Sequence, residues 1–407
     1  MPTVAGGYAA LFRIPHVRPV FAWVSLARLQ FGVLPLALLL LLAGQRQSYA
    51  EAGAATAGYA LTAGLLGPLR AHLADRHGHG RTLVVLSALN AIGLAVVVAL
   101  ASAPLAVLVP AAVLAGCLPA PIGPVMRSTW RVLTDGEQQL QTAYSLDTVS
   151  EEVLYVVGPL VAAAGVARFD ARAVLAASLL ALFVASVGLW RTLPPQPVVD
   201  AGEGERKPVQ HWRSASFLAG LAPATGVGVL LGAFDLAVIA AAIAVSGQAA
   251  AGLPAAVLSI GSVVGGLAYG RRRWPGRPLL QAITCVALAS AGAAVTAAVT
   301  GNLLAMLVLV ALTGLFVAPA IVASYLVADA ATAEASAETT SWVNSAFNVG
   351  NAGGPALSGI LIDARGPSAA ILAAAVAAVV ITSVAAAVRH GPSAGSPDTH
   401  RHPGDGA

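Results

Sequence analysis

The sequence predicts an all-α membrane protein whose twelve transmembrane helices form two related six-helix halves. Three observations carry this prediction. Of the 407 residues, 57% are hydrophobic and only 10% are charged, whereas a soluble domain carries about 25% charged residues. Apolar windows long enough to cross a bilayer recur along the whole chain. Three short sequence landmarks also recur, in the same order, about half a chain apart.

The apolar windows are expected to be helices, because they are apolar on every face instead of alternating as the strands of a barrel do. The first six lie near residues 18–44, 51–73, 82–102, 104–126, 141–166 and 172–191. The second six lie near residues 214–246, 250–270, 278–299, 302–327, 339–362 and 367–388. The expected organisation is a first half 1–191, a Pro- and charge-rich linker 192–212, a second half 213–390 and a disordered tail 391–407.

Basic residues are distributed unevenly between the two sides of these spans. Seventeen Lys and Arg residues, Arg70 and Arg127 among them, fall on the side of the termini and the linker. Four fall on the other side, and Arg28 lies inside a span. Loops rich in Lys and Arg stay in the cytoplasm. We therefore expect both termini and the linker to be cytoplasmic.

The repeated landmarks indicate an internal duplication. The pairs are G-C-L-P-A-P from Gly116 with G-L-F-V-A-P from Gly314, V-G-P ending at Pro159 with G-G-P ending at Pro355, and D-A-R at Asp170 with D-A-R at Asp363. Their offsets are 198, 196 and 193 residues. Three landmarks in one order at a nearly constant offset favour duplication over chance.

The loop after the second span carries a motif that indicates a family. It reads GPLRAHLADRHGHGRT from residue 67 and resembles the G-x-x-x-D-R-x-G-R-R motif of the major facilitator superfamily, with Asp75, Arg76, Gly78 and Arg81 in its later part. The corresponding second-half loop has Gly270 in place of the Asp. The resemblance implies the fold of that family, with a substrate site between the halves. It also implies that this loop latches the halves; a charged loop that only sets topology is the alternative.

The fifth and eleventh spans resemble the antiporter motif of the same superfamily. Gly158 and Pro159 keep its Gly-Pro step in the fifth span, and Gly354 and Pro355 keep it in the eleventh. Such small residues let helices approach closely and bend. The resemblance implies a proton-coupled efflux permease of an actinobacterial drug or metabolite branch, in the bacterial cytoplasmic membrane. The fifth-span copy has lost its earlier glycines, so uptake, or a non-transporting receptor or assembly protein, stays open.

Ionisable groups inside spans are costly and are therefore functional candidates. Here they are Arg28 in the first span, Glu151 and Glu152 in the fifth and Asp235 in the seventh, whereas Asp147 in the fifth span lies closer to the cytoplasmic interface. A shift of 196 residues aligns Thr148, Glu152 and Tyr155 with Asn344, Asn348 and Asn351, each trio on one helical face, whereas Glu151 aligns with Phe347. We expect this polar stripe to face the interior and favour Glu152 for proton or substrate binding. Glu151 is expected to pack against a neighbour or to pair with Arg28.

Two of these candidates also have a purely structural interpretation. An Arg28–glutamate pair could only fix helix packing. Asp235 follows Gly228 and Gly232 on one face, which could contact a substrate or simply pack against a helix. No catalytic, cofactor, metal or nucleic-acid motif is evident, and Cys117 and Cys285 are expected to be buried thiols. The expected partners are a small-molecule substrate, protons and the lipid bilayer, and the expected state is a monomer.

Overall fold

The helices of the protein follow the predicted spans closely. The computed structural model describes residues 7–46, 49–194, 215–247, 250, 252–330 and 336–390, and no strand occurs in these ranges. Its helices are α1 (Tyr8–Leu11), α2 (Val17–Arg46), α3 (Tyr49–Leu65), α4 (Gly67–His77), α5 (His79–Ala99), α6 (Leu105–Gly116), α7 (Ile122–Leu133), α8 (Gly136–Arg168), α9 (Ala171–Thr192), α10 (Ala215–Ser246), α11 (Leu253–Arg271), α12 (Pro278–Ala297), α13 (Leu303–Gly314), α14 (Val317–Ala330), α15 (Ala337–Arg365) and α16 (Pro367–His390). Most of the predicted linker and the whole predicted tail lie outside the described residues.

Three predicted spans are interrupted. Only Leu66 separates α3 from α4, residues 117–121 separate α6 from α7, and residues 315–316 separate α13 from α14. With each such pair joined, the described helices after α1 make twelve segments. Eight stretches of the described chain are long and apolar enough to cross a membrane by length and composition alone.

Two of the interruptions fall on the first repeated landmark. The helix α6 ends at Gly116 and α13 ends at Gly314. A Cβ atom on Gly116 would collide with the Tyr59 carbonyl and with Thr62 of α3, and one on Gly314 would collide with the Leu258 carbonyl and lie close to the Ser262 amide of α11. Each glycine therefore permits a close approach to the span two before its own, so the sequence repeat has a counterpart in packing.

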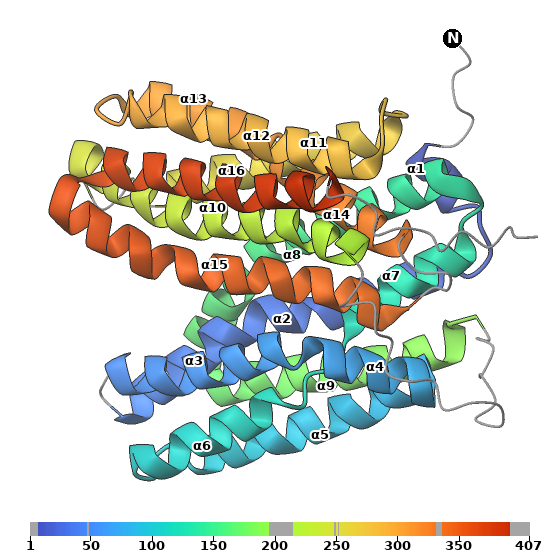
Figure 1. Cartoon of the computed structure of the whole chain (residues 1–407). Coiled ribbons are helices and arrows are strands. Elements are labelled where there is room, and N and C mark those ends of the chain that lie inside the picture. Colours follow the sequence, from blue (N-terminus) through green and yellow to red (C-terminus); the bar gives the residue numbers. More distant parts are fainter. Residues whose placement is uncertain are drawn as a thin grey trace, which may run out of the picture.

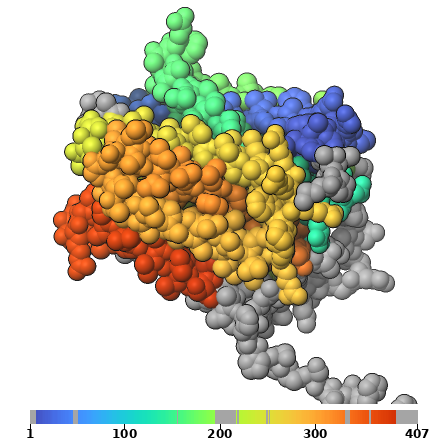
Figure 2. Space-filling model, turned by 90° about the horizontal axis from the view of Figure 1, so that it is seen from above, coloured from blue at the N-terminus to red at the C-terminus, as the bar shows by residue number. Residues whose placement is uncertain are grey.

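The helices before residue 195 and those after residue 214 occupy different sides of the molecule. In Figure 1 the helices α10–α16 lie above α2–α6 and α9, and α1 and α7 lie at the right-hand end. Figure 2 shows the face covered by α11–α14, with blue and green residues of the earlier helices along one edge and red residues of α15 and α16 along another. We call the end with α1 and α7 the basic end and the opposite one the far end.

The hydrophobic core is shared at the basic end and divided towards the far end. The shared cluster includes Val24, Trp130 and Tyr144 of the earlier helices together with Val322 and Tyr325 of the later ones. Towards the far end, one cluster consists only of residues 33–175 and another only of residues 227–378. The two sets of helices are thus packed together at the basic end and have separate cores beyond it.

Large apolar side chains also cover the outer faces of the helices. Ile92, Leu160, Leu180, Ile260 and Ile360 are each at least 61% exposed. Apolar patches of this extent on an outer surface mark contact with lipid or protein.

Two arginines that the sequence analysis counted among the basic loop residues are not exposed. Arg70 in α4 and Arg127 in α7 are buried. The predicted end of the fourth span near residue 126 was wrong, because α7 continues to Leu133 and Arg127 therefore lies within this helix.

Candidate functional site

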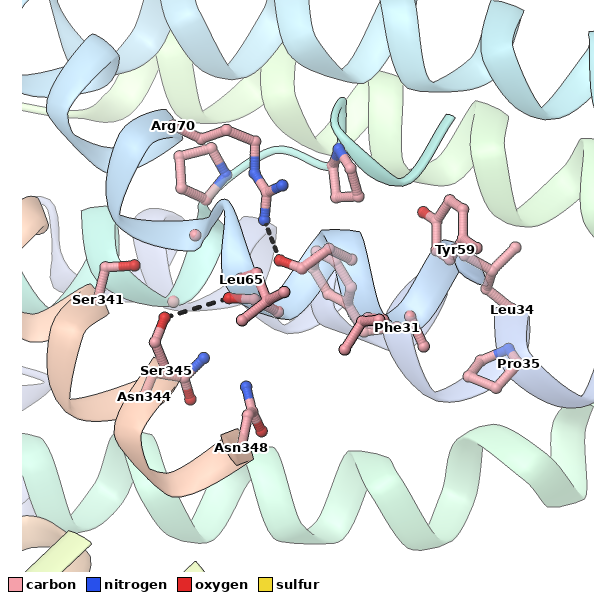
Figure 3. A pocket seen from close by; sticks show the side chains of 18 of the residues that line it. Phe31, Leu34, Pro35, Tyr59, Leu65, Arg70, Ser341, Asn344, Ser345 and Asn348 are labelled. Carbon is pink, nitrogen blue, oxygen red and sulfur yellow. Dashed lines mark hydrogen bonds between the residues drawn. The ribbon is translucent and has the colours of Figure 1, made fainter. Parts of the chain in front are cut away.

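A cavity of about 770 Å³ lies between the two sets of helices. Its walls come from α2, α3, α4, the α6–α7 break, α7, α8 and α15, and Figure 3 shows part of this lining. Figure 3 shows Asn344, Ser345 and Asn348 of α15 on one side and Phe31 and Leu34 of α2 on another. Because both sets contribute walls, any movement of one set against the other changes the shape of this cavity.

Four charged side chains form a closed cluster at the cavity wall. Arg28 donates to both carboxylate oxygens of Asp147, at 2.8 and 2.9 Å, and its Nη2 lies 3.0 Å from Glu151 Oε1. Arg127 Nη2 lies 2.5 Å from Glu151 Oε2, and Arg127 Nε lies 3.4 Å from Asp147 Oδ2. Each arginine therefore meets both carboxylates. Bidentate Arg–carboxylate geometry of this kind fixes orientation as well as adding energy.

Neighbouring polar and aromatic groups complete the cluster. Trp130 Nε1 donates to Asp147 Oδ1 at 3.3 Å, and Arg28 Nη1 donates to Ser150 Oγ at 3.2 Å. The Arg127 guanidinium lies 4.0 Å from the ring centre of Tyr325, which belongs to the later set of helices. The cluster thus reaches across the interface through a cation–π contact.

Glycines bring the cluster together and open it to the cavity. Gly32 of α2 and Gly158 of α8 meet backbone to backbone, so that α2 and α8 lie close enough for Arg28 to reach Asp147. A Cβ atom on Gly123 would lie 3.0 Å from Glu151 Oε1 and 3.2 Å from Arg127 Nη1. Gly123 itself lines the cavity. Its missing side chain leaves the ion pairs facing the cavity.

The two adjacent glutamates point to different places. Glu151 lines the cavity, and its contact with Arg28 is the pairing that the sequence suggested. Glu152 is not among the lining residues; it accepts a hydrogen bond of 2.5 Å from Ser262 of α11. Glu152 therefore lies in the seam between α8 and α11, where the two sets of helices meet.

The asparagine stripe of α15 faces the cavity as the repeat suggested. Asn344, Asn348 and Asn351 all line it. Within the described part of the chain, none of their side chains makes a hydrogen bond. Their amides are therefore available to a ligand. The side chain of Tyr155, in the aligned stripe of α8, lies outside the described ones.

Gly228, Gly232 and Asp235 lie along one face of α10, but the glycines and the aspartate have different surroundings. Cβ atoms on Gly228 and Gly232 would collide with the α15 backbone at Phe347 and Asn351. The glycine face of α10 thus packs against α15. Asp235 lies one turn further on, and its Oδ1 is buried without a hydrogen-bond partner among the described residues.

Arg70 is a further buried cation on the cavity wall. Its guanidinium donates to the carbonyls of Gly116 at 3.2 Å and Cys117 at 3.4 Å, and to that of Ala63 (Figure 3). Ala63 lies in the last turn of α3, Gly116 is the last residue of α6 and Cys117 follows it, so all three carbonyls lie where the helical hydrogen-bond pattern is interrupted. Arg70 thus donates hydrogen bonds to carbonyls that lack helical donors because two helices are interrupted there.

The predicted latch motif lies at the basic end and contacts α15. Asp75 accepts hydrogen bonds from Ser336 Oγ at 2.9 Å and from the backbone N–H groups of Ala337 and Glu338 at 3.0 Å each. Its carboxylate therefore lies at the N-terminus of α15, where the helix dipole favours negative charge. Gly78 adopts φ +89°, which favours glycine, while Arg76 and Arg81 are exposed.

The surroundings of Asp75 also change its ionisation. Burial raises the pKa of this carboxyl, but the hydrogen bond and charge of His79 and the N–H groups of Glu338 and Ala337 outweigh burial, so that the pKa is lowered. The sequence suggested an arginine as its partner. Among the described residues, the arginine that forms an ion pair with a carboxylate of the other set is Arg131, whose Nη1 lies 2.8 Å from Asp329 Oδ1.

The other seam at the basic end uses backbone acceptors. Gln141 Nε2 donates to the Tyr269 carbonyl at 2.6 Å, and Thr142 Oγ1 donates to the Gly270 carbonyl at 2.6 Å. A Cβ atom on Gly270 would lie 2.6 Å from Ser145 Cβ. This close contact explains why glycine stands where the first-half motif has Asp75.

Comparisons with known proteins agree with this architecture. The family model described as Major Facilitator Superfamily matches residues 20–222. The chain has the major facilitator fold. Three similar solved structures are the human organic anion transporter MFSD10 (14% identity, 90% of this chain and 98% of that one, TM-score 0.64), the Escherichia coli fucose:proton symporter FucP (14%, 92% and 99%, 0.65) and a bacterial homologue of the iron transporter ferroportin in an outward-facing state (13%, 91% and 97%, 0.62). No curated protein matches the sequence.

The major facilitator fold and the apolar helices make the chain a multi-pass membrane protein. Two members of the charged cluster escaped the sequence-based selection. Asp147 precedes Glu151 by four residues, one helical turn, and this spacing could have joined them to Arg28. Arg127 had no such signal, because it lay beyond the predicted end of its span.

Proposed function

We propose that this protein is a secondary transporter that moves a small organic molecule across the bacterial cytoplasmic membrane by alternating access. The observation that carries the proposal is the cavity walled by both sets of helices, combined, within the described residues, with a shared core and cross-set ion-pair and capping contacts at the basic end. A binding site closed at one end is one state of an alternating-access cycle. The basic end is the cytoplasmic one in this proposal.

Proton coupling is proposed to use Glu152. Its hydrogen bond to Ser262 crosses the seam between α8 and α11, so relative movement of the two sets would change its partner. A carboxylate whose environment changes between two states can bind a proton in one state and release it in the other. Export is the proposed direction, and the eleventh-span motif at Gly354 and Pro355 supports it.

The test is a proteoliposome assay of pH-gradient dissipation with the purified protein across a panel of organic solutes. We expect at least one solute to dissipate the gradient. Glu152→Gln is expected to abolish proton movement, whereas Glu137→Gln, an exposed position on the same helix, should leave it unchanged. Full transport with unaltered pH dependence in Glu152→Gln would rule out the coupling role of Glu152.

Direction and the non-transporting alternative are separated by the same vesicles. Loading solute inside or outside vesicles of known protein orientation distinguishes export from uptake. A scaffold or receptor would dissipate no gradient with any solute. Its gene deletion would also leave the secretion of, and the sensitivity to, every compound unchanged.

A further inference from the structure

The charges around the cavity do not balance. Its lining contains three arginines, Arg28, Arg70 and Arg127, and one carboxylate, Glu151. Asp147 lies behind the lining and supplies a second carboxylate. Both carboxylates are held by Arg28 and Arg127, so these four charges compensate one another. Arg70 is left as an excess positive charge.

Within the described residues, the Arg70 side chain has only backbone carbonyls as partners. In the described part of the chain no acidic side chain contacts it, and its Nε is buried there without a hydrogen-bond partner. Carbonyl oxygens accept hydrogen bonds from a guanidinium but do not neutralise its charge. An arginine stays protonated in proteins. The side chain is only 6% exposed, so its charge acts in a poorly solvated region.

Other donors on the cavity wall reinforce this potential. The N-terminus of α7, at Ile122, follows the break that lines the cavity, and a helix N-terminus carries partial positive charge. The half-helices that line transporter sites commonly direct such termini at anionic groups of the substrate. Asn344 and Asn348 add amide donors from the opposite wall.

The rest of the lining is apolar. Phe31, Leu34 and Leu38 of α2 and Leu61 and Leu65 of α3 form an extended hydrophobic wall. A ligand that satisfied both surfaces would need an acidic group at one end and an apolar body. A purely hydrophilic anion would leave the apolar wall without a partner.

We propose that the ligand of this cavity is an amphipathic organic anion, whose acidic group is attracted by Arg70 and its apolar part bound along α2 and α3. The inference that this ligand is the transported molecule rests on the proposed transport function. The charge of the cavity can nevertheless be measured without transport. Asn348→Cys, in a Cys117→Ala/Cys285→Ala background, places a thiol on the cavity wall. Ser102→Cys, at an exposed position on the far end, is the reference.

Purified protein in detergent is labelled with anionic 2-sulfonatoethyl methanethiosulfonate or cationic 2-(trimethylammonio)ethyl methanethiosulfonate. We expect the anionic-to-cationic rate ratio at residue 348, divided by that at residue 102, to be about tenfold or more, the lower range for electrostatic concentration in a cleft. A ratio of one or below overturns the proposal.

Two matched pairs of variants assign the charge to its source. Arg70→Gln should lower the ratio towards one, whereas Arg70→Lys should keep most of it. Because Arg70→Gln also removes bonds to two helix ends, Leu65→Glu with Leu65→Gln as control provides a change that leaves Arg70 in place. The carboxylate at residue 65 should lower the ratio and the amide should not. An unchanged ratio in folded Arg70→Gln would exclude Arg70 as the source.

A transport arm uses solutes with one apolar body and three head groups: 3-phenylpropanoate, 3-phenylpropanamide and 3-phenylpropylamine, together with longer homologues. We expect only the carboxylic acids of this panel to be transported. Transport of amines or amides with a thiol ratio that favours the cation would overturn the anion proposal while supporting transport. Movement of no solute, together with a ratio that favours the anion, would count against transport and support the charge assignment.

Discussion

At the scale of single residues, the charged cluster combines two carboxylates with unequal surroundings. The side chain of Asp147 is fully buried and that of Glu151 is 22% exposed. Removal of one partner from a buried ion pair leaves an uncompensated charge, which costs about 3–5 kcal/mol. Water in the cavity can solvate a charge near Glu151 but cannot reach Asp147.

We therefore expect Asp147→Asn to lower the unfolding temperature in detergent markedly, and Glu151→Gln to lower it less. Glu137→Gln is the control for loss of an exposed acidic residue on the same helix. The measurement is thermal unfolding followed by intrinsic fluorescence. Equal effects of the Asp147 and Glu151 variants would contradict the difference in solvation.

Two adjacent glycines of α15 give a second comparison. A Cβ atom on Gly354 would lie 2.5 Å from the Ala233 amide nitrogen, whereas one on Gly353 would meet nothing within 4 Å. Gly354→Ala is expected to destabilise the protein by about 1–3 kcal/mol, the usual cost of overpacking. Gly353→Ala is expected to be neutral or to stabilise by about 0.5–1 kcal/mol. Denaturant titration of both variants measures the difference, and similar values would show that α10 and α15 can move apart.

At the residue level, the internal repeat predicted which face of α15 is turned inwards. The alignment of Asn348 with Glu152 placed the asparagines towards the interior, and they line the cavity. The same alignment could not reveal that Glu152 turns towards α11, because that depends on which helix packs beside α8. Arg70 could not be recognised as a cavity residue, because its position depends on the two helix breaks it bridges.

At the scale of elements, the loop motif acts on a helix far away in sequence. Asp75 accepts from the first N–H groups of α15, so α15 has a cap from the other set of helices. Loss of an N-cap acceptor costs about 0.5–2 kcal/mol. Because the pKa of Asp75 is lowered on folding, its stabilising contribution is complete above the ordinary aspartate pKa of about 4 and is lost as pH falls through the lower folded value.

Asp75→Ala should therefore lower the unfolding temperature at pH 6, and the difference from the unaltered protein should shrink as pH is lowered below about 4. Asp75→Asn keeps an acceptor that caps helices but loses the charge, so it should show a smaller difference at pH 6. Thermal unfolding between pH 3 and pH 6 measures both. A difference that stays constant with pH would assign the effect to shape and not to charge.

The helical elements themselves were largely predictable, because each apolar window is long and bounded by polar or proline-containing segments. The interruptions of the second, fourth and tenth spans were not predicted. Pro119 and Pro121 mark one of them in sequence, but the break after Gly314 has no proline until Pro319. There, the close approach to α11 determines where the helix ends, and that contact is not local.

At the scale of the whole molecule, Arg131 and Asp329 join the two sets at the basic end. Arg131→Asp alone should weaken this closure, and Arg131→Asp with Asp329→Arg should restore part of it. A cysteine pair spanning the basic end, cross-linked in detergent, reports closure through its cross-linking yield. Failure of the double variant to recover any yield would mean that the pair does not contribute to closure.

The divided core has a consequence for turnover. In the structure, separation of the two sets at the basic end must expose to solvent the apolar side chains of the shared cluster around Trp130, Tyr144 and Tyr325. A bound ligand can offset that loss with its own contacts, but an empty cavity offers none. In the proposed transport cycle we therefore expect the return of the unloaded protein to be the slow step. Ligand on the opposite side of the membrane would then accelerate transport, and the exchange of ligand across the membrane would be faster than its net transport.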